Sequence, residues 1–125
     1  MKTIKNFEEF IQNGIVKKQS PNKSRSEFLE IESNQNFEFL EEILNKMEIT
    51  DKNANYIVKT CYDILMELIR AKMLLKGYNA QGQGAHEAEV SYLRELKFSE
   101  KEVQFAEQLR YFRNGILYYG TTLDA

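Results

Sequence analysis

The residues best suited to chemistry lie near the C-terminal end of the chain, where an arginine falls on the apolar face of a predicted helix. At about 100° per residue, Arg113 lies near the centre of that face. The apolar residues that share the face are Ala106, Leu109, Phe112, Ile116 and Leu117. A guanidinium aimed at a core is costly unless a carboxylate or water meets it. Arg113 is therefore predicted to belong either to a buried ion pair or to a binding site.

The single histidine, His86, and the single cysteine, Cys61, do not form a recognisable catalytic or metal centre. Cys61 lies in an apolar stripe, which favours a buried, inert thiol over a nucleophile. One histidine without a Glu-x-x-His pair does not supply the ligands of a helical-bundle metal site. We therefore expect no metal and no cofactor, and no Ser-His-Asp or Cys-His catalysis.

Length and composition predict one helical domain over residues 1–125. The net charge of −2 argues against a broadly basic nucleic-acid surface, although a local basic patch is compatible with it. No apolar run approaches the roughly 20 residues of a membrane span, and residues 1–19 do not resemble a signal peptide. We expect a cytoplasmic protein without a membrane segment.

Helical spacing and capping signals predict an all-α fold: an up-and-down four-helix bundle over residues 20–120, preceded by a leading helix and an extended segment in residues 1–19. Ser20-Pro21 is a helix start signal, and Ser99-x-x-Glu102 is a capping box. Residues 15–18 are expected to be extended, and residues 77–84 to form a flexible glycine-containing loop. The predicted helices cover residues 6–13, 21–47, 51–76, 86–96 and 99–119.

Antiparallel packing would bring most of the polar core positions to one pole of this bundle. The expected members are Glu32, Ser33, Asn36, Lys72, His86, Arg113, Asn114, Tyr118 and Tyr119. At this pole Glu32, completed by Asn36, would form an ion pair with Arg113. The pair would be either purely structural or part of a site.

Short stretches along nearly the whole chain resemble the HEPN domain family (higher eukaryotes and prokaryotes nucleotide-binding). They are residues 10–18, the small residues Ser33 and Asn36, residues 70–77 before a glycine-rich loop, His86, and Leu109-x-x-x-Arg113-Asn114. The order and spacing of these stretches along the chain support the resemblance. HEPN domains are small helical bundles that occur beside minimal nucleotidyltransferases and in toxin–antitoxin systems.

The resemblance implies a site on the last helix. HEPN ribonucleases carry an arginine, then four to six residues, then a histidine, and two protomers bring these motifs together. Arg113 and Asn114 match the first half, but Tyr118 and Tyr119 stand where the histidine is expected. Because a tyrosine with a pKa near 10 is a poor base at neutral pH, efficient nuclease chemistry is not expected. His86 is not at the motif position and receives no catalytic role.

The resemblance thus predicts a homodimeric HEPN-like module that binds a nucleotide or RNA phosphate, or a cognate nucleotidyltransferase or antitoxin. Arg113 would hold phosphate and Asn114 would orient it, with stacking from Tyr118 or Tyr119 and contributions from Lys72 and His86. One alternative is a metal-independent ribonuclease toxin in which Tyr118 or His86 replaces the missing histidine. The other is a purely structural dimerisation or interaction module.

Overall fold

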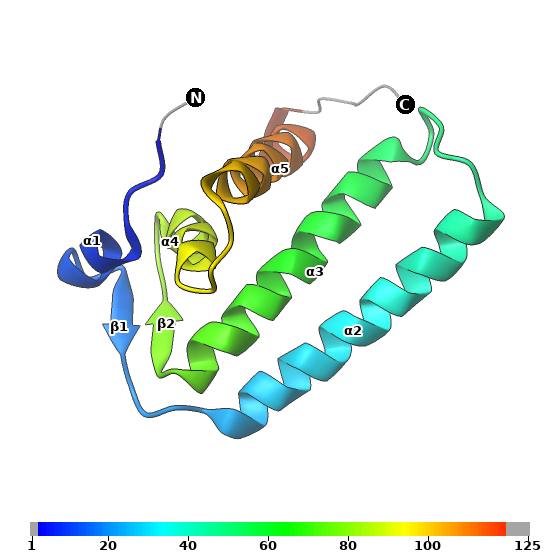
Figure 1. Ribbon diagram of the computed structural model, residues 1–125. Coiled ribbons are helices and arrows are strands. Elements are labelled where there is room, and N and C mark those ends of the chain that lie inside the picture. Colours follow the sequence, from blue (N-terminus) through cyan, green and yellow to red (C-terminus); the bar gives the residue numbers. More distant parts are fainter. Residues whose placement is uncertain (1–2, 120–125) are drawn as a thin grey trace.

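The computed structural model describes residues 3–119, with side chains as far as Arg113 (Figure 1). The elements are α1 (Phe7–Gln12), β1 (Val16–Lys18), α2 (Lys23–Lys46), α3 (Ala54–Leu75), β2 (Tyr78–Ala80), α4 (Ala85–Ser91), a 3₁₀ turn (Tyr92–Arg94) and α5 (Glu100–Tyr119). The all-α class with a short leading helix is confirmed. Among the described residues, no helix has the length and apolar character needed to cross a membrane.

The two longest helices, α2 and α3, form an antiparallel hairpin in which α2 lies at the outer edge of the molecule (Figure 1). The buried residues of α2 are Ser26, Ser33 and Leu40, seven residues apart, so one narrow line of this helix faces α3. Ser26 Oγ donates a hydrogen bond to the Ala71 carbonyl oxygen at 2.7 Å. Small side chains on this line let the two helices approach closely.

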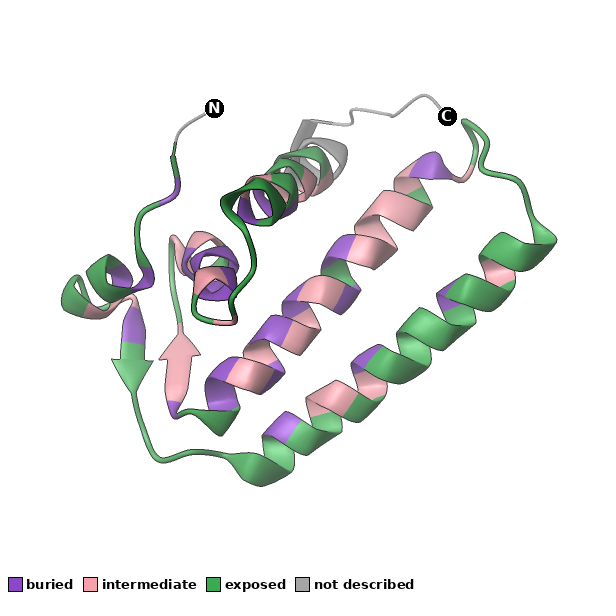
Figure 2. Ribbon diagram, in the orientation of Figure 1, coloured by how far each residue is buried: buried purple, intermediate pink, exposed green. Residues whose placement is uncertain are grey.

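Helix α3 is central because α2 packs on one flank while α4 and α5 pack on the other. The side facing α4 and α5 buries Tyr62, Met66, Ile69 and Met73. The apolar stripe seen in the sequence is buried only in part: Ala54, Ile64 and Ile69 are buried, whereas its other members before Leu75 are half-buried, namely Ile57, Val58, Cys61, Leu65 and Leu68. The burial expected for Cys61 is therefore only partial. The half-buried members lie between the two packed flanks of α3 instead of at the centre of one of them (Figure 2).

Strand β1 precedes α2 and strand β2 follows α3, and the two pair as a small antiparallel sheet. Val16 pairs with Ala80 and Lys18 with Tyr78. The extended conformation expected for residues 15–18 is confirmed, whereas residues 78–80, expected in a flexible loop, form a strand. Gly77 permits the connection: its φ is +82°, and a Cβ there would lie 2.3 Å from the Gln19 carbonyl oxygen.

Local capping chemistry sets the helix ends, in part as predicted. The Ser99–Glu102 capping box is confirmed, with Glu102 N donating to Ser99 Oγ at 3.2 Å and Ser99 N to Glu102 Oε1 at 2.9 Å. Helix α2 begins at Lys23, two residues later than predicted, because the Asn22 side chain caps it by accepting from Arg25 N at 3.1 Å. Helix α4 is shorter than predicted and continues as the 3₁₀ turn.

Candidate functional site

Tyr62 lies near the middle of α3, and polar side chains from α4 and α5 contact it. Its ring is buried, and its hydroxyl lies 3.1 Å from His86 Nδ1 at the start of α4. The Tyr62 and His86 rings stack with centroids 6.3 Å apart. From α5, the Arg113 guanidinium lies 5.8 Å from the centroid of the Tyr62 ring, within cation–π range. Two of the sequence-predicted residues, Arg113 and His86, therefore meet on one tyrosine.

Arg113 pairs with Asp63, the residue after Tyr62, and not with Glu32 as expected. Arg113 Nε donates to Asp63 Oδ1 at 3.0 Å, and the Asp63 side chain is half exposed. The predicted pairing was wrong because α5 meets α3 near residues 62–63 and so never reaches the side of α2 that carries Glu32. The pair with Asp63 engages one guanidinium nitrogen and leaves the two terminal nitrogens of Arg113 free of hydrogen bonds within the described part of the chain.

Two further arginines flank Tyr62, and each makes a bidentate pair with a buried glutamate. Arg70 Nε and Nη2 donate to Glu89 at 2.8 and 3.2 Å. Arg110 Nε and Nη2 donate to both carboxylate oxygens of Glu107, one turn earlier on α5. The Arg70–Glu89 pair links α3 to α4, whereas the Arg110–Glu107 pair lies within α5. Since both carboxylates are buried and fully engaged, Arg113 is the more available cation.

Burial dominates the protonation of the central groups. It raises the pKa of Tyr62 to about 12, despite the opposing effect of the nearby arginines, so the phenol is neutral at physiological pH. Partial burial also lowers the pKa of His86 below its usual value, and the positive charges of Arg70, Arg113 and Arg110 act in the same direction. His86 is therefore neutral near pH 7, and the residue is exposed to solvent.

A separate acidic cleft of about 230 Å³ lies between α2 and α3, lined by Asn36, Asp63 and Glu67 among others. Among the described residues, Glu67 Oε1 is a buried side-chain oxygen without a hydrogen-bond partner. Burial, Glu32 and Asp63 raise the pKa of Glu67. Glu32 is half-buried and Asn36 is exposed, so the polar core expected from these two residues does not form; Asn36 instead lines this cleft.

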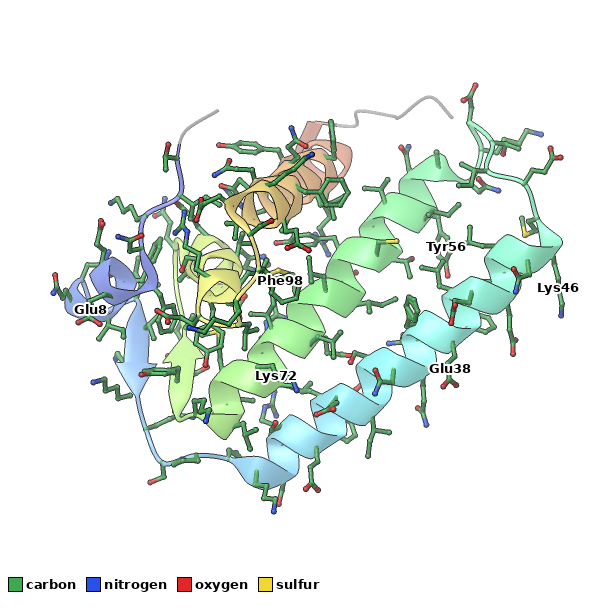
Figure 3. The ribbon with its side chains drawn as sticks, viewed as in Figure 1. Glu8, Glu38, Lys46, Tyr56, Lys72 and Phe98 are labelled. Atoms are coloured by element: carbon green, nitrogen blue, oxygen red, sulfur yellow. The ribbon has the colours of Figure 1, made fainter. Side chains whose placement is uncertain are left out.

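The remaining predicted site residues do not join the cluster. Lys72 lies ten residues beyond Tyr62 on α3, which is about 15 Å along the helix axis; Figure 3 shows it toward the other end of α3. Asn114, Tyr118 and Tyr119 lie outside the residues whose side chains are described. The predicted polar pole is thus replaced by a cluster at mid-helix.

Sequence reasoning missed Tyr62, Asp63, Arg70 and Glu89. Each sits outside the apolar stripe used to orient α3 or inside a helix too short to show a clear face. One signal could have predicted the Arg70–Glu89 pair: Arg70 on α3 and Glu89 on α4 carry opposite charges, and each stands next to apolar residues in the sequence. Within the described residues, no group of three or more His, Cys, Asp or Glu side chains is arranged to hold a metal ion.

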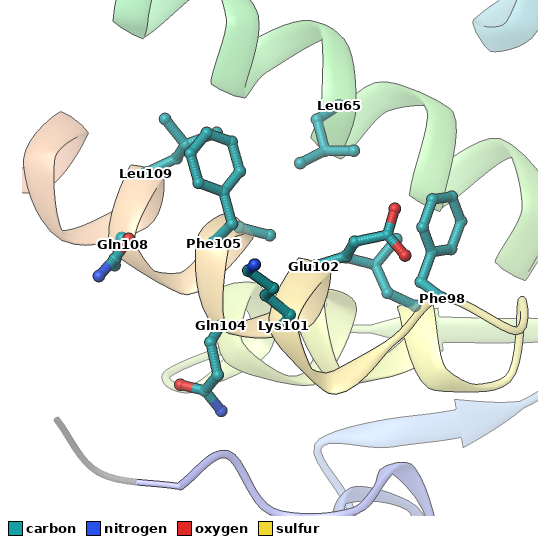
Figure 4. A pocket seen from close by; sticks show the side chains of 10 residues that line it. Leu65, Phe98, Lys101, Glu102, Gln104, Phe105, Gln108 and Leu109 are labelled. Carbon is teal, nitrogen blue, oxygen red and sulfur yellow. The ribbon is translucent and has the colours of Figure 1, made fainter.

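An apolar groove of about 670 Å³ lies beside the cluster, between α3 and α5 (Figure 4). Leu65 forms its α3 wall, and Phe105 and Leu109 form its α5 wall. Phe98 closes one end, and the rim carries polar residues such as Lys101 and Gln108. The groove ends about one helical turn before Arg113, so both features share α5.

Comparisons with family models, curated proteins and solved structures found no match to this chain.

Proposed function

We propose that this chain is a HEPN-like helical module that binds a phosphate group of a nucleotide or RNA at Arg113, Tyr62 and His86. The observation that carries the proposal is that Arg113 and His86, from different helices, both contact Tyr62. Such convergence of a cation, a neutral hydroxyl and an exposed imidazole is typical of an anion site. The bidentate pairs Arg70–Glu89 and Arg110–Glu107 hold the other two nearby arginines in place.

Each group has a distinct role in this proposal. The terminal nitrogens of Arg113 donate to two phosphate oxygens, the geometry that a guanidinium fits best. The exposed edge of His86 adds a third contact, and Tyr62 fixes the orientation of both side chains. Asn114, Tyr118 and Tyr119 follow on the same helix and stay in the proposal on sequence grounds, for orientation and base stacking.

Binding of a fluorescently labelled single-stranded RNA, followed by anisotropy, tests the site. Arg113→Ala should weaken binding by roughly tenfold to a hundredfold, because a charged hydrogen bond is worth about 1.5–3 kcal/mol. Arg113→Lys should recover only part of the loss, because an ammonium cannot make the bidentate contact. The matched control is Arg25→Ala, which removes an exposed arginine at the start of α2.

Unchanged RNA and nucleotide binding by Arg113→Ala, together with a lower melting temperature, would instead identify the Arg113–Asp63 pair as purely structural. An equal loss in Arg25→Ala would show that binding depends on overall charge and not on the site.

A metal-independent ribonuclease is the second candidate function, and the geometry of His86 favours it. His86 is neutral near pH 7, as a general base must be, and it is oriented by Tyr62 next to Arg113. We expect His86→Ala to abolish RNA cleavage in the presence of a chelator, with Tyr118→Phe as the comparison. Absence of cleavage by the unaltered protein would leave the binding module as the function.

We further propose that the protein is a homodimer joined through the α3–α5 groove, which would place two Arg113 residues near one interface. Phe98 and Phe105 line this groove and are 44% and 60% exposed, and burying such rings is the main driving force of stable dimers. Sedimentation equilibrium should show a dimer that Phe105→Glu converts to a monomer.

A cognate nucleotidyltransferase or antitoxin would be a further partner, detectable by co-purification with the dimer.

A further inference from the structure

The outward side of α2 combines exposed apolar side chains with a concentration of negative charge. Its members, which we call the outer face of α2, are Phe28, Ile31, Gln35, Glu38, Phe39 and Glu42. At about 100° per residue they fall in one arc, opposite the buried line of Ser26, Ser33 and Leu40. Phe28, Ile31 and Phe39 are 63%, 58% and 59% exposed. Figure 3 shows Glu38 turned away from α3.

The charge of this segment has one sign. Between residues 26 and 45 the chain has glutamates and no lysine or arginine; the glutamates are Glu27, Glu30, Glu32, Glu38, Glu41 and Glu42. The chain as a whole carries only −2, so the acidity is local to α2. A surface with large apolar side chains and one sign of charge is typical of a binding surface for a partner of opposite charge.

We propose that the outer face of α2 is a docking surface for a basic amphipathic helix of another protein. The face runs from Phe28 to Glu42, about 21 Å along the helix axis, the length of a partner helix of about 15 residues. Apolar side chains of the partner would pack on Phe28, Ile31 and Phe39, as in helix-in-groove recognition. Its lysines and arginines would pair with Glu38 and Glu42, and arginine would also stack on the phenylalanine rings.

The charge also decides against other occupants. Nucleic acids and anionic membranes would be repelled by the glutamates. In a two-fold antiparallel contact between copies centred on Gln35, Glu42 of one copy would face Phe28 of the other. Burying a carboxylate against a phenyl ring without a counter-charge is unfavourable.

The test uses the full chain and a fluorescein-labelled synthetic helix of about 15 residues, with leucines along one face and lysines and arginines on the other. We expect a Kd below about 100 µM that weakens severalfold as salt rises. Phe39→Ala should weaken binding at least tenfold, as for an interface hot spot. Tyr111→Ala, at an aromatic side chain that is 50% exposed on α5, is the matched control and should have no effect.

Charge and location have their own controls. Glu38→Gln with Glu42→Gln should reduce both affinity and salt dependence, whereas Glu8→Gln on α1 should leave both unchanged. Amide chemical-shift changes on peptide addition should map to α2. The proposal is overturned if the peptide does not bind, if a glutamate-substituted peptide binds equally well, if the shifts map to the α3–α5 groove, or if Phe39→Ala changes the oligomeric state.

Discussion

Arg70, Arg110 and Arg113 differ in how many hydrogen bonds they donate to their carboxylate partners, and this difference defines the site. Arg70 and Arg110 donate twice to buried glutamates, while Arg113 donates once to a half-exposed aspartate. A buried bidentate pair is rigid and destabilising to break, whereas an exposed single contact is readily exchanged for a ligand. The availability of Arg113 is therefore set by its neighbours.

Asp63→Asn should release Arg113 for anion binding. An exposed ion pair is worth about 0.2–1 kcal/mol, so RNA affinity should rise roughly twofold to fivefold while the free energy of unfolding changes by less than about 1 kcal/mol. Anisotropy titration and urea unfolding measure the two quantities. Glu107→Ala, in contrast, should lower the free energy of unfolding by about 3–5 kcal/mol, because it leaves the Arg110 charge largely buried and unpaired. Similar stability losses in both variants would contradict this distinction.

His86 should make stability depend on pH. Because burial lowers its pKa in the folded state, the unfolded chain binds more protons as pH falls below about 6.5. The contribution of His86 is therefore complete above that pH and is lost as pH falls through its lower folded-state pKa. Urea midpoints of the unaltered protein should fall from pH 7.5 to 5.5 by more than those of His86→Gln. Parallel curves for the two proteins would exclude this role.

At the level of elements, local signals predicted the helices but not their relative orientation. The Ser99–Glu102 box depends only on neighbouring residues, and it is as expected. Which side of α3 is buried depends on two flanking partners, so Tyr62 is buried while Leu65, in the predicted stripe, lines an open groove. The position at which α5 crosses α3 also has no local signal, which is why Asp63 rather than Glu32 meets Arg113.

The sheet that joins the segments before α2 and after α3 depends on one glycine. Gly77→Ala should be more destabilising than Gly82→Ala, although both have φ values near +82°. Both variants incur the strain of a left-handed residue, about 1–2 kcal/mol. Only at Gly77 does the added Cβ also collide with the Gln19 carbonyl oxygen, whereas Gly82 has open space. Thermal unfolding of the two variants measures the difference, and equal melting temperatures would refute the close contact.

The whole molecule separates two surfaces of opposite character on the two flanks of α3. The flank facing α4 and α5 gathers arginines around Tyr62, whereas the outer face of α2 is acidic and aromatic. The small net charge conceals this division. The phosphate ligand proposed at Arg113 and the basic helix proposed on α2 would therefore bind at a distance from each other, with α3 between the two sites.

Helix α2 is held mainly by one neighbour, and Leu40 is its one buried large apolar side chain. It should therefore detach from α3 as a unit well below the energy of global unfolding. Native-state hydrogen exchange should show α2 amides, such as that of Leu40, exchanging faster than those of Met66 and Ile69 in α3. A basic helix bound to the outer face would slow exchange along the whole of α2. Equal protection of the two helices in the free protein would show that α2 opens only with the rest of the fold.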